Sequence, residues 1–249
     1  MGLLTLFMFA LLMIHAQSYV QGYSSVTGTM LNLALYLLPL MTLMLGSFSL
    51  TGEKEDGSWD LLSTYPLSTT AFIAGKYAGL AVVLLVIVAF GFGVAGVAGW
   101  LAGGGFSFDT YLLLLVFSAI LALMFLAVSM LVGTLARNRW QALTIAVAVW
   151  FFLVIAWAPL LIAVLGLLPY MWIKPAISVL TMINPAELSR LFAVIHLGGG
   201  SVLGPEYYDW VKWIRRPSGT FAFAAFFLLW ILIWVTLADW LWERGRTRV

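Results

Sequence analysis

The sequence predicts an all-α, polytopic integral membrane protein with six transmembrane helices. Of its 249 residues, 63% are hydrophobic and only 9% are charged, whereas an ordinary globular domain is about 45–50% apolar and about 25% charged. The apolar residues also form long runs, and a helix needs roughly 20 such residues to cross a bilayer. A soluble chain of this length would need far more polar residues to cover its surface. We therefore expect the apolar side chains to face lipid.

Six apolar runs define the predicted spans. They lie near residues 2–20, 30–50, 77–101, 111–136, 142–168 and 221–242. The first run lacks the basic start and the small-residue cleavage site of a signal peptide, so we interpret it as a span. No soluble domain fits between the runs, and no repeat with a period of about 20–50 residues is present. The sequence therefore predicts a single transmembrane domain over residues 1–249.

The lysines and arginines in the connections between the spans predict the orientation. The connections assigned to one side are basic, with Lys54, Lys76, Arg137, Arg139, Arg244, Arg246 and Arg248. Those on the other side, residues 21–29 and 103–110, contain neither lysine nor arginine. Because basic residues in short connections favour the cytoplasm, we expect a multi-pass protein of the cell membrane with both termini cytoplasmic. The segment 169–219 would then be extracytoplasmic, and its Arg215 and Arg216 count against this orientation.

Several classes of function are excluded by the same sequence. The formal net charge is +2 without a basic stripe, which argues against nucleic acid as a partner. The absence of cysteine excludes disulfides and thiolate metal sites. The stretch from Gly91 to Gly96 matches a dinucleotide-binding pattern but lies inside an apolar span, and Gly75-Lys76 lacks the remainder of a phosphate-binding loop. We therefore expect the chain not to be an enzyme, and to bind no metal, nucleotide or other cofactor itself.

A charged block, residues 51–76, separates the second and third spans and holds four of the ten acidic residues. Pro66 disfavours a helical conformation at the residue before it, so we expect a short helix over residues 57–64 and a second helix that continues into the third span. Acids at the start of the short helix suit the positive end of its dipole. The block is either a solvated loop that fixes topology or a docking helix for a protein. Its exposed apolar residues would be Trp59, Leu61 and Leu62.

The block resembles the hallmark of ABC-2 type transporter permeases. The resemblance rests on the phrase from Gly52 to Ser68, with its Gly-Glu-Lys-Glu-Asp-Gly-Ser start, and on Gly75-Lys76 beyond it. It implies a type V exporter-like fold with six spans, in which this loop is a coupling helix that docks on a separate ATP-binding subunit. That subunit would bind ATP and Mg²⁺. The implied ATPase-coupling residues are Gly52, Glu53, Glu55, Gly57, Ser58, Trp59, Leu61, Leu62, Pro66, Gly75 and Lys76.

The sequence departs from the family's pattern at three places. Ser58 stands where threonine is common, and Thr69 stands where a basic residue is common. The second departure puts a specific salt bridge to the ATPase in doubt at that position. The family also usually begins with a basic amphipathic elbow helix, whereas the first apolar run starts here near residue 2.

Another helix, outside the six spans, is predicted in the segment between the fifth and sixth spans. Asn184, Pro185 and Glu187 form an N-cap, a proline at the first helical position and an acid at the third. An apolar stripe follows, and we expect the helix to lie at the outer membrane interface and to end at residues 198–200. The candidate contacts to an extracytoplasmic partner are Asn184, Pro185, Glu187, Arg190 and Leu191.

Three phrases also resemble the permeases of nitrous oxide reductase maturation complexes. They begin at Thr64, Ala148 and Asn184 and end at Leu67, Phe152 and Leu191. The resemblance implies two copies of the permease, two copies of the ATPase and an extracytoplasmic β-helical copper-site assembly protein. The chain would then relay ATPase motion across the membrane. Two alternatives remain: an ABC-2 exporter of a lipid, drug or peptide, and an ATP-independent channel or secondary transporter, which predicts inverted repeats or charged midplane residues.

Overall fold

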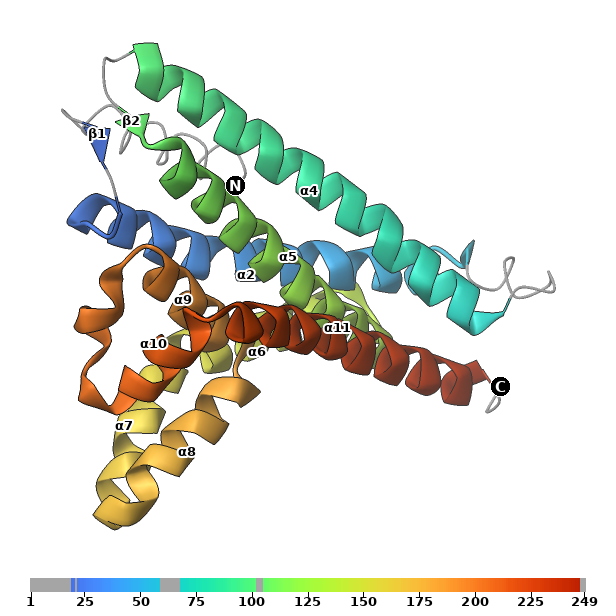
Figure 1. Cartoon of the computed structure of the whole chain (residues 1–249). Coiled ribbons are helices and arrows are strands. Elements are labelled where there is room, and N and C mark those ends of the chain that lie inside the picture. Colours follow the sequence, from blue (N-terminus) through green and yellow to red (C-terminus); the bar gives the residue numbers. More distant parts are fainter. Residues whose placement is uncertain (1–18, 21, 59–67, 102–104, 247–249) are drawn as a thin grey trace.

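The protein is a bundle of long helices in the computed structural model, which describes residues 19–20, 22–58, 68–101 and 105–246 (Figure 1). Among these described residues, five helices are long and apolar enough to cross a membrane. They are α2 (Ser25–Glu55), α4 (Thr69–Leu101), α5 (Phe108–Leu135), the continuous α6 (Arg139–Trp150), η1 (Phe151–Ala156) and α7 (Trp157–Leu167), and α11 (Pro217–Arg246). The predicted all-α membrane fold is confirmed. The predicted first span, residues 2–20, lies outside the described residues except for its last two.

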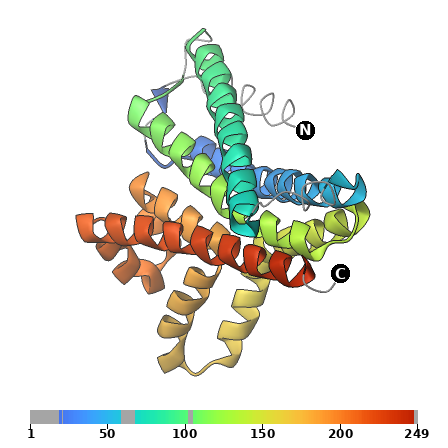
Figure 2. The same ribbon diagram turned by 90° about the vertical axis from the view of Figure 1, so that its right-hand side faces the viewer.

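All five of these segments meet at one end of the bundle. Helices α2, α5 and α11 end there, and α4 and α6 begin there, on the right of Figure 1. We call this the charged end, because it holds Glu53, Lys54, Glu55, Asp56, Lys76, Arg139 and Asp239. Helix α4 projects from the bundle on one side, and the neighbouring helices α7 and α8 project on another (Figure 2).

The segment between α7 and α11 enters the bundle and returns. Helices α8 (Tyr170–Ile183) and α9 (Pro185–His196) are bent by 105° at Asn184 and together have the length and composition of a broken span or a re-entrant loop. Because α6 starts and α11 ends at the charged end, the chain both enters and leaves this segment at the opposite end. We therefore describe α8 and α9 as a re-entrant pair. The short η2 (Gly199–Leu203), η3 (Pro205–Tyr207) and α10 (Tyr208–Ile214) complete the connection.

Helix α9 is enclosed more deeply than the sequence predicts. Its apolar stripe was expected at the membrane interface, but Leu188, Leu191 and Ile195 pack with Trp210 and Ile214 of α10 and with Phe223 of α11. Two of these three side chains, Leu191 and Ile195, are 3% and 1% exposed. The stripe is real, and protein rather than lipid covers it.

At the opposite end, short contacts join the start of α2 to α5 and α9. Strand β1 (Tyr19–Val20) pairs in parallel with β2 (Gly105–Phe106). The backbone N–H of Gly22 donates to the Thr110 hydroxyl at 3.2 Å, and that of Tyr23 donates to the Leu197 carbonyl at 2.8 Å. Gly22 has a φ of +72°, which a residue with a side chain adopts only with strain. These contacts hold the starts of α2 and α5 beside the end of α9.

Helices α2 and α5 pack through small residues. Ser129 and Gly133, four residues apart on α5, face Gly46 and Leu50 of α2. A Cβ added at Gly46 would lie 2.7 Å from the Ser129 Cβ, and one added at Gly133 would lie 2.8 Å from the Leu50 Cβ. Small residues at such spacing let helix backbones approach closely in a membrane. The α2–α5 seam is therefore the tightly packed centre of the bundle.

Substitution of Gly46 by alanine tests this seam. The added methyl group must displace Ser129, whose hydroxyl is itself bonded to the Leu126 carbonyl at 2.6 Å. We expect Gly46→Ala to lower the free energy of unfolding by about 1–3 kcal/mol, the usual cost of overpacking. Thermal unfolding of the purified protein measures it. Gly79→Ala on α4 is the matched control, because an added Cβ there meets none of the described residues within 4 Å; equal unfolding midpoints for the two variants would contradict the seam.

Candidate functional site

Helix α2 extends into the charged block, past residue 50, where the second span was predicted to end. Helix α2 continues to Glu55, so Thr51 to Glu55 are helical. Asp56 closes the helix with its N–H donating to the Gly52 carbonyl at 2.9 Å, and Gly57 follows in the left-handed region with a φ of +69°. Glycine in this conformation is a common helix terminator. On the other side, α4 begins at Thr69, where a second helix was expected.

Glu53 and Lys76 join the end of α2 to the start of α4. The Lys76 ammonium donates to the Glu53 carboxylate, and both side chains are largely shielded from solvent, at 23% and 22% exposed. Both were implied by the family resemblance as coupling residues. They lie in contact with one another within one chain.

Glu55 and Asp56 join α2 to the start of α6. The Glu55 carboxylate accepts a hydrogen bond from the Arg139 backbone N–H at 2.9 Å and also contacts the Arg139 Nε at 3.0 Å. Asp56 contacts the Arg139 Nη2 at 3.1 Å. Arg139 is the first residue of α6, so the carboxylate lies at the positive end of that helix dipole. A side chain at Gly52 would crowd the guanidinium, since an added Cβ lies 3.0 Å from its Nη2.

Lys54 joins α2 to the ends of α5 and α11. Its ammonium donates to the carbonyls of Gly133, Thr134 and Ala136 at 3.0, 2.7 and 2.9 Å. These carbonyls belong to the last turn of α5 and to its C-cap residue Ala136, where no further helical N–H is available. The same ammonium lies 4.5 Å from the ring centroid of Trp242 on α11, a cation–π distance. One side chain thus links three helices.

Helices α4 and α11 also meet at the charged end. The rings of Phe72 and Trp242 have centroids 5.6 Å apart, and the Thr70 hydroxyl donates to the Asp239 carboxylate at 2.8 Å. Successive residues of a helix point about 100° apart. The four consecutive charged residues at the end of α2, residues 53–56, therefore point in different directions. The end of α2 is therefore bonded to α4, α5 and α6 and lies against α11.

Among the remaining sequence-predicted coupling residues, Ser58 directly follows Gly57 and is half-buried. Gly75 lies on α4, and an added Cβ there would meet none of the described residues within 4 Å. Trp59, Leu61, Leu62 and Pro66 lie outside the described residues, as does most of the short helix expected over residues 57–64. Their contact with an ATPase stays a prediction. The structure brings together Glu53, Glu55 and Lys76 with Gly52.

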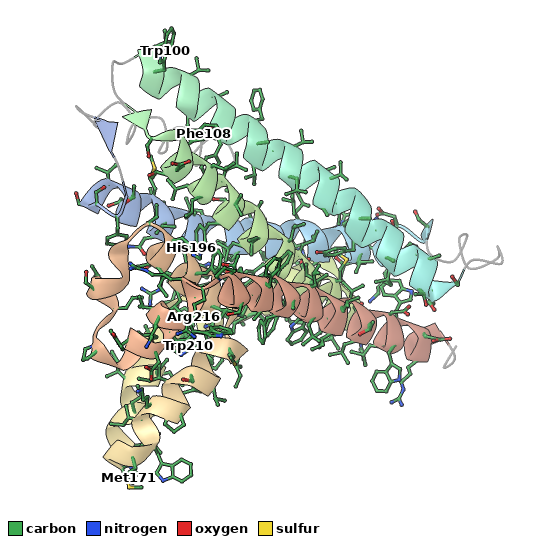
Figure 3. The ribbon with its side chains drawn as sticks, in the orientation of Figure 1. Trp100, Phe108, Met171, His196, Trp210 and Arg216 are labelled. Carbon is green, nitrogen blue, oxygen red and sulfur yellow. The ribbon has the colours of Figure 1, made fainter. Side chains whose placement is uncertain are left out.

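At the opposite end, the candidate partner-contact residues have different surroundings. Asn184 and Leu191 are 0% and 3% exposed, and Pro185 is also buried. Glu187 and Arg190 are bonded to each other, with the Arg190 Nη2 2.7 Å from the carboxylate, and both retain some exposure. Figure 3 shows His196, Trp210 and Arg216 at this end of the bundle, away from the C-terminal end of α11. Contact with an outer partner stays a prediction.

Within the described residues, no group of three or more histidine, aspartate and glutamate side chains could hold a metal ion. The arrangement is instead a set of ion pairs and helix-end contacts that fixes helices to one another. These contacts link the end of α2 to the neighbouring helices.

Comparison with known proteins identifies the family. Residues 4–245 match the family of ABC-2 family transporter proteins. The chain belongs to this family. It is 30% identical over 191 residues to the probable ABC transporter permease protein NosY of Stutzerimonas stutzeri. The matched region covers 74% of this chain and 69% of that protein. It is 31% identical over 187 residues to the probable ABC transporter permease protein NosY of Pseudomonas aeruginosa, with 72% and 66% covered.

In this ABC-2 permease the sequence-based site was incomplete. Lys54 served only to predict topology, and Arg139 was interpreted only as a topological charge. Both positions carried a signal: Lys54 lies inside the charged phrase, and Arg139 follows Asn138, whose side chain caps α6 by accepting from the Gln141 N–H at 2.8 Å. A charged residue one helix turn from a predicted helix end indicates a partner at that end.

We expect Lys54→Met to loosen the charged end of the permease. Methionine keeps the apolar stem, but three carbonyls of α5 lose their donor. Hydrogen bonds to charged groups are worth about 1.5–3 kcal/mol, so the free energy of unfolding should fall by about 2 kcal/mol. Thermal unfolding measures this loss, with Lys212→Met as the control because Lys212 is an exposed residue of α10. Equal unfolding temperatures for the two variants would show that the contacts of Lys54 with α5 do not stabilise the fold.

Proposed function

We propose that this permease couples ATP hydrolysis in a separate cytoplasmic subunit to mechanical signalling across the membrane. The proposed assembly has two copies of the permease and two copies of the ATP-binding subunit. One observation carries the proposal: the four consecutive charges at the end of α2 reach α4, α5, α6 and α11. A displacement of the adjoining segment, residues 59–67, would move the ends of these helices together.

The proposal assigns the charged end to the cytoplasm. Basic residues described there include Lys54, Lys76, Arg137, Arg139 and Arg244. Trp242, near the end of α11, lies beside Lys54 and so supports a C-terminus on the same side as the charged block. In the proposal, the N-terminus lies on this side too, and the membrane is the cell membrane.

A role in copper-site maturation of nitrous oxide reductase is the proposed specific task. The three phrases that resemble those permeases support it, and so does the similarity to two proteins named as probable ABC transporter permeases NosY. The extracytoplasmic partner would be a β-helical copper-site assembly protein. Glu187 and Arg190 are its candidate contacts, because they retain exposure. Asn184, Pro185 and Leu191 are buried and would act by positioning α9.

Export of a lipid, drug or peptide is a second candidate, favoured by one apolar groove. The groove has a volume of about 840 Å³ and lies between α5, α6, η1, α8 and α11. Its walls include Leu131, Val149, Phe152, Ile183, Trp230 and Ile233. This volume lies within the range of about 300–1,000 Å³ of small-molecule sites. Stimulation of ATP hydrolysis by a lipid, drug or peptide in nanodiscs would favour export over signalling.

The experiment that tests coupling separates contact from transmission. Leu61→Ala with Leu62→Ala should abolish co-purification of the ATPase subunit, because these apolar side chains are the proposed contact. Glu53→Gln with Glu55→Gln should leave the subunit bound, since both carboxylates contact residues of their own chain. The same variant should reduce permease-dependent stimulation of ATP hydrolysis at least about fivefold, the low end of usual coupling energies.

Two outcomes would count against the proposal. Unchanged co-purification after the leucine substitutions removes the docking assignment. Unchanged stimulation after the glutamate substitutions removes the transmission role of the charged end. Asp209→Asn is the control for loss of an acid, because Asp209 lies in an exposed ion pair with Lys174 on α8, away from the charged end.

A further inference from the structure

The side chain of Asn184 forms hydrogen bonds with two elements, the start of α9 and the segment η1. Its Oδ1 accepts hydrogen bonds from the backbone N–H groups of Ala186 at 2.9 Å and Glu187 at 3.4 Å, which caps α9. Its Nδ2 donates to the Leu153 carbonyl at 2.7 Å. The side chain is 0% exposed, so water does not compete for either contact. The corner between α8 and α9 is thereby attached to the middle of the fifth span.

The attachment point is an irregular part of that span. Leu153 lies in η1, whose residues 151–156 are π-helical. Pro159 follows and has no N–H to donate to the carbonyl four residues before it. Single π-helical turns are found most often at functional sites, and an inserted side chain is one cause of such a break. An amide bonded to this carbonyl therefore fixes the position at which the fifth span departs from a regular helix.

The same helix begins at the charged end. Arg139, its first residue, is bonded to Glu55 and Asp56 of α2. Leu153 lies 14 residues further along, about 20 Å at 1.5 Å per residue. These contacts therefore form one continuous path from the end of α2 to Arg139, along α6 to the Leu153 carbonyl, and from there to Asn184 and the start of α9.

We infer that Asn184 is the positioning residue that makes α9 follow the fifth span when the charged end moves. The inference rests on the proposed coupling function and names the joint that it requires. The two hydrogen-bonding atoms of Asn184 separate this role from simple helix capping. Aspartate caps a helix as well as asparagine does, but it has no amide to donate to Leu153. Asn184→Asp therefore keeps the cap and removes the joint.

The natural absence of cysteine allows a clean measurement of α9. His196 is the last residue of α9 and is exposed (Figure 3), and His196→Cys provides one thiol in each permease chain for a water-soluble maleimide. The labelling rate is measured on the complete complex with the ATPase subunit in nanodiscs, without nucleotide and with Mg-ATP and vanadate. In the His196→Cys parent we expect nucleotide to change the rate at least about fivefold. Asn184→Asp in this background should abolish that change while α9 stays folded and the ATPase subunit stays bound.

A neighbouring buried hydroxyl supplies the matched control. Thr181 is 1% exposed, and its Oγ1 has no hydrogen-bond partner among the described residues. Thr181→Val should keep the nucleotide response of the parent. If Asn184→Asp prevents folding, Asn184→Ser takes its place, since serine caps a helix but is too short to reach Leu153.

The outcomes distinguish the inference from the function on which it rests. If nucleotide does not change the labelling rate of the His196→Cys parent, the result contradicts both the joint at Asn184 and the proposed coupling function. A responsive parent with an equally responsive Asn184→Asp or Asn184→Ser variant overturns the joint alone and leaves coupling intact. Loss of the response in the asparagine variants, with the response kept in Thr181→Val and unfolding midpoints close to the parent's, supports the joint.

Discussion

The carbonyl groups at the C-terminal end of α5 need a donor, and Lys54 of α2 supplies it. A lipid environment offers no water to satisfy backbone groups, so helix ends within a membrane protein must find partners in the chain. The buried start of α9 meets the same requirement through Asn184, and at the solvent-exposed start of α6 the Glu55 carboxylate accepts from the Arg139 backbone N–H. In each case the side chain comes from, or bonds to, a second element. The polar groups that complete helix ends are therefore also the contacts that hold helices to one another.

This arrangement changes the interpretation of the acids in the charged block. Surface ion pairs contribute little to stability, and the exposed Arg139 contacts with Glu55 and Asp56 are of this kind. The more shielded Glu53–Lys76 pair and the Lys54 contacts are the stronger ties. The acids also act on different neighbours, because Glu53 contacts α4 whereas Glu55 and Asp56 both contact α6. In the proposed function, a soluble subunit would then dock on the apolar residues of the adjoining segment, residues 59–67.

The sequence predicted those parts of the fold that depend on long apolar runs. The helix that starts after Pro66 and the N-cap at Asn184 could also be predicted, because proline and an N-cap residue each have a specific effect on the neighbouring backbone. The re-entrant pair was not predicted as such, since Asn184-Pro185 divides it into two helices that are each too short to span a bilayer. The end of α2 was placed too early because its charges indicated a loop, although Gly57 marked the true terminator. Contacts such as Lys54 with α5 join residues about 80 positions apart, and helical spacing carries no information about them.

The π-helical turns of η1 have a consequence for the length of the fifth span. A π-helical turn holds one residue more than an α-helical turn, so the wide turn absorbs the extra residue within η1. Loss of one residue between positions 151 and 156 would restore a regular helix and leave α6 and α7 close to their present register. The altered backbone would lie at Leu153, whose carbonyl accepts the hydrogen bond from Asn184. Among related chains, this short stretch is where an insertion or a deletion would change that contact without changing the alignment of α6 and α7.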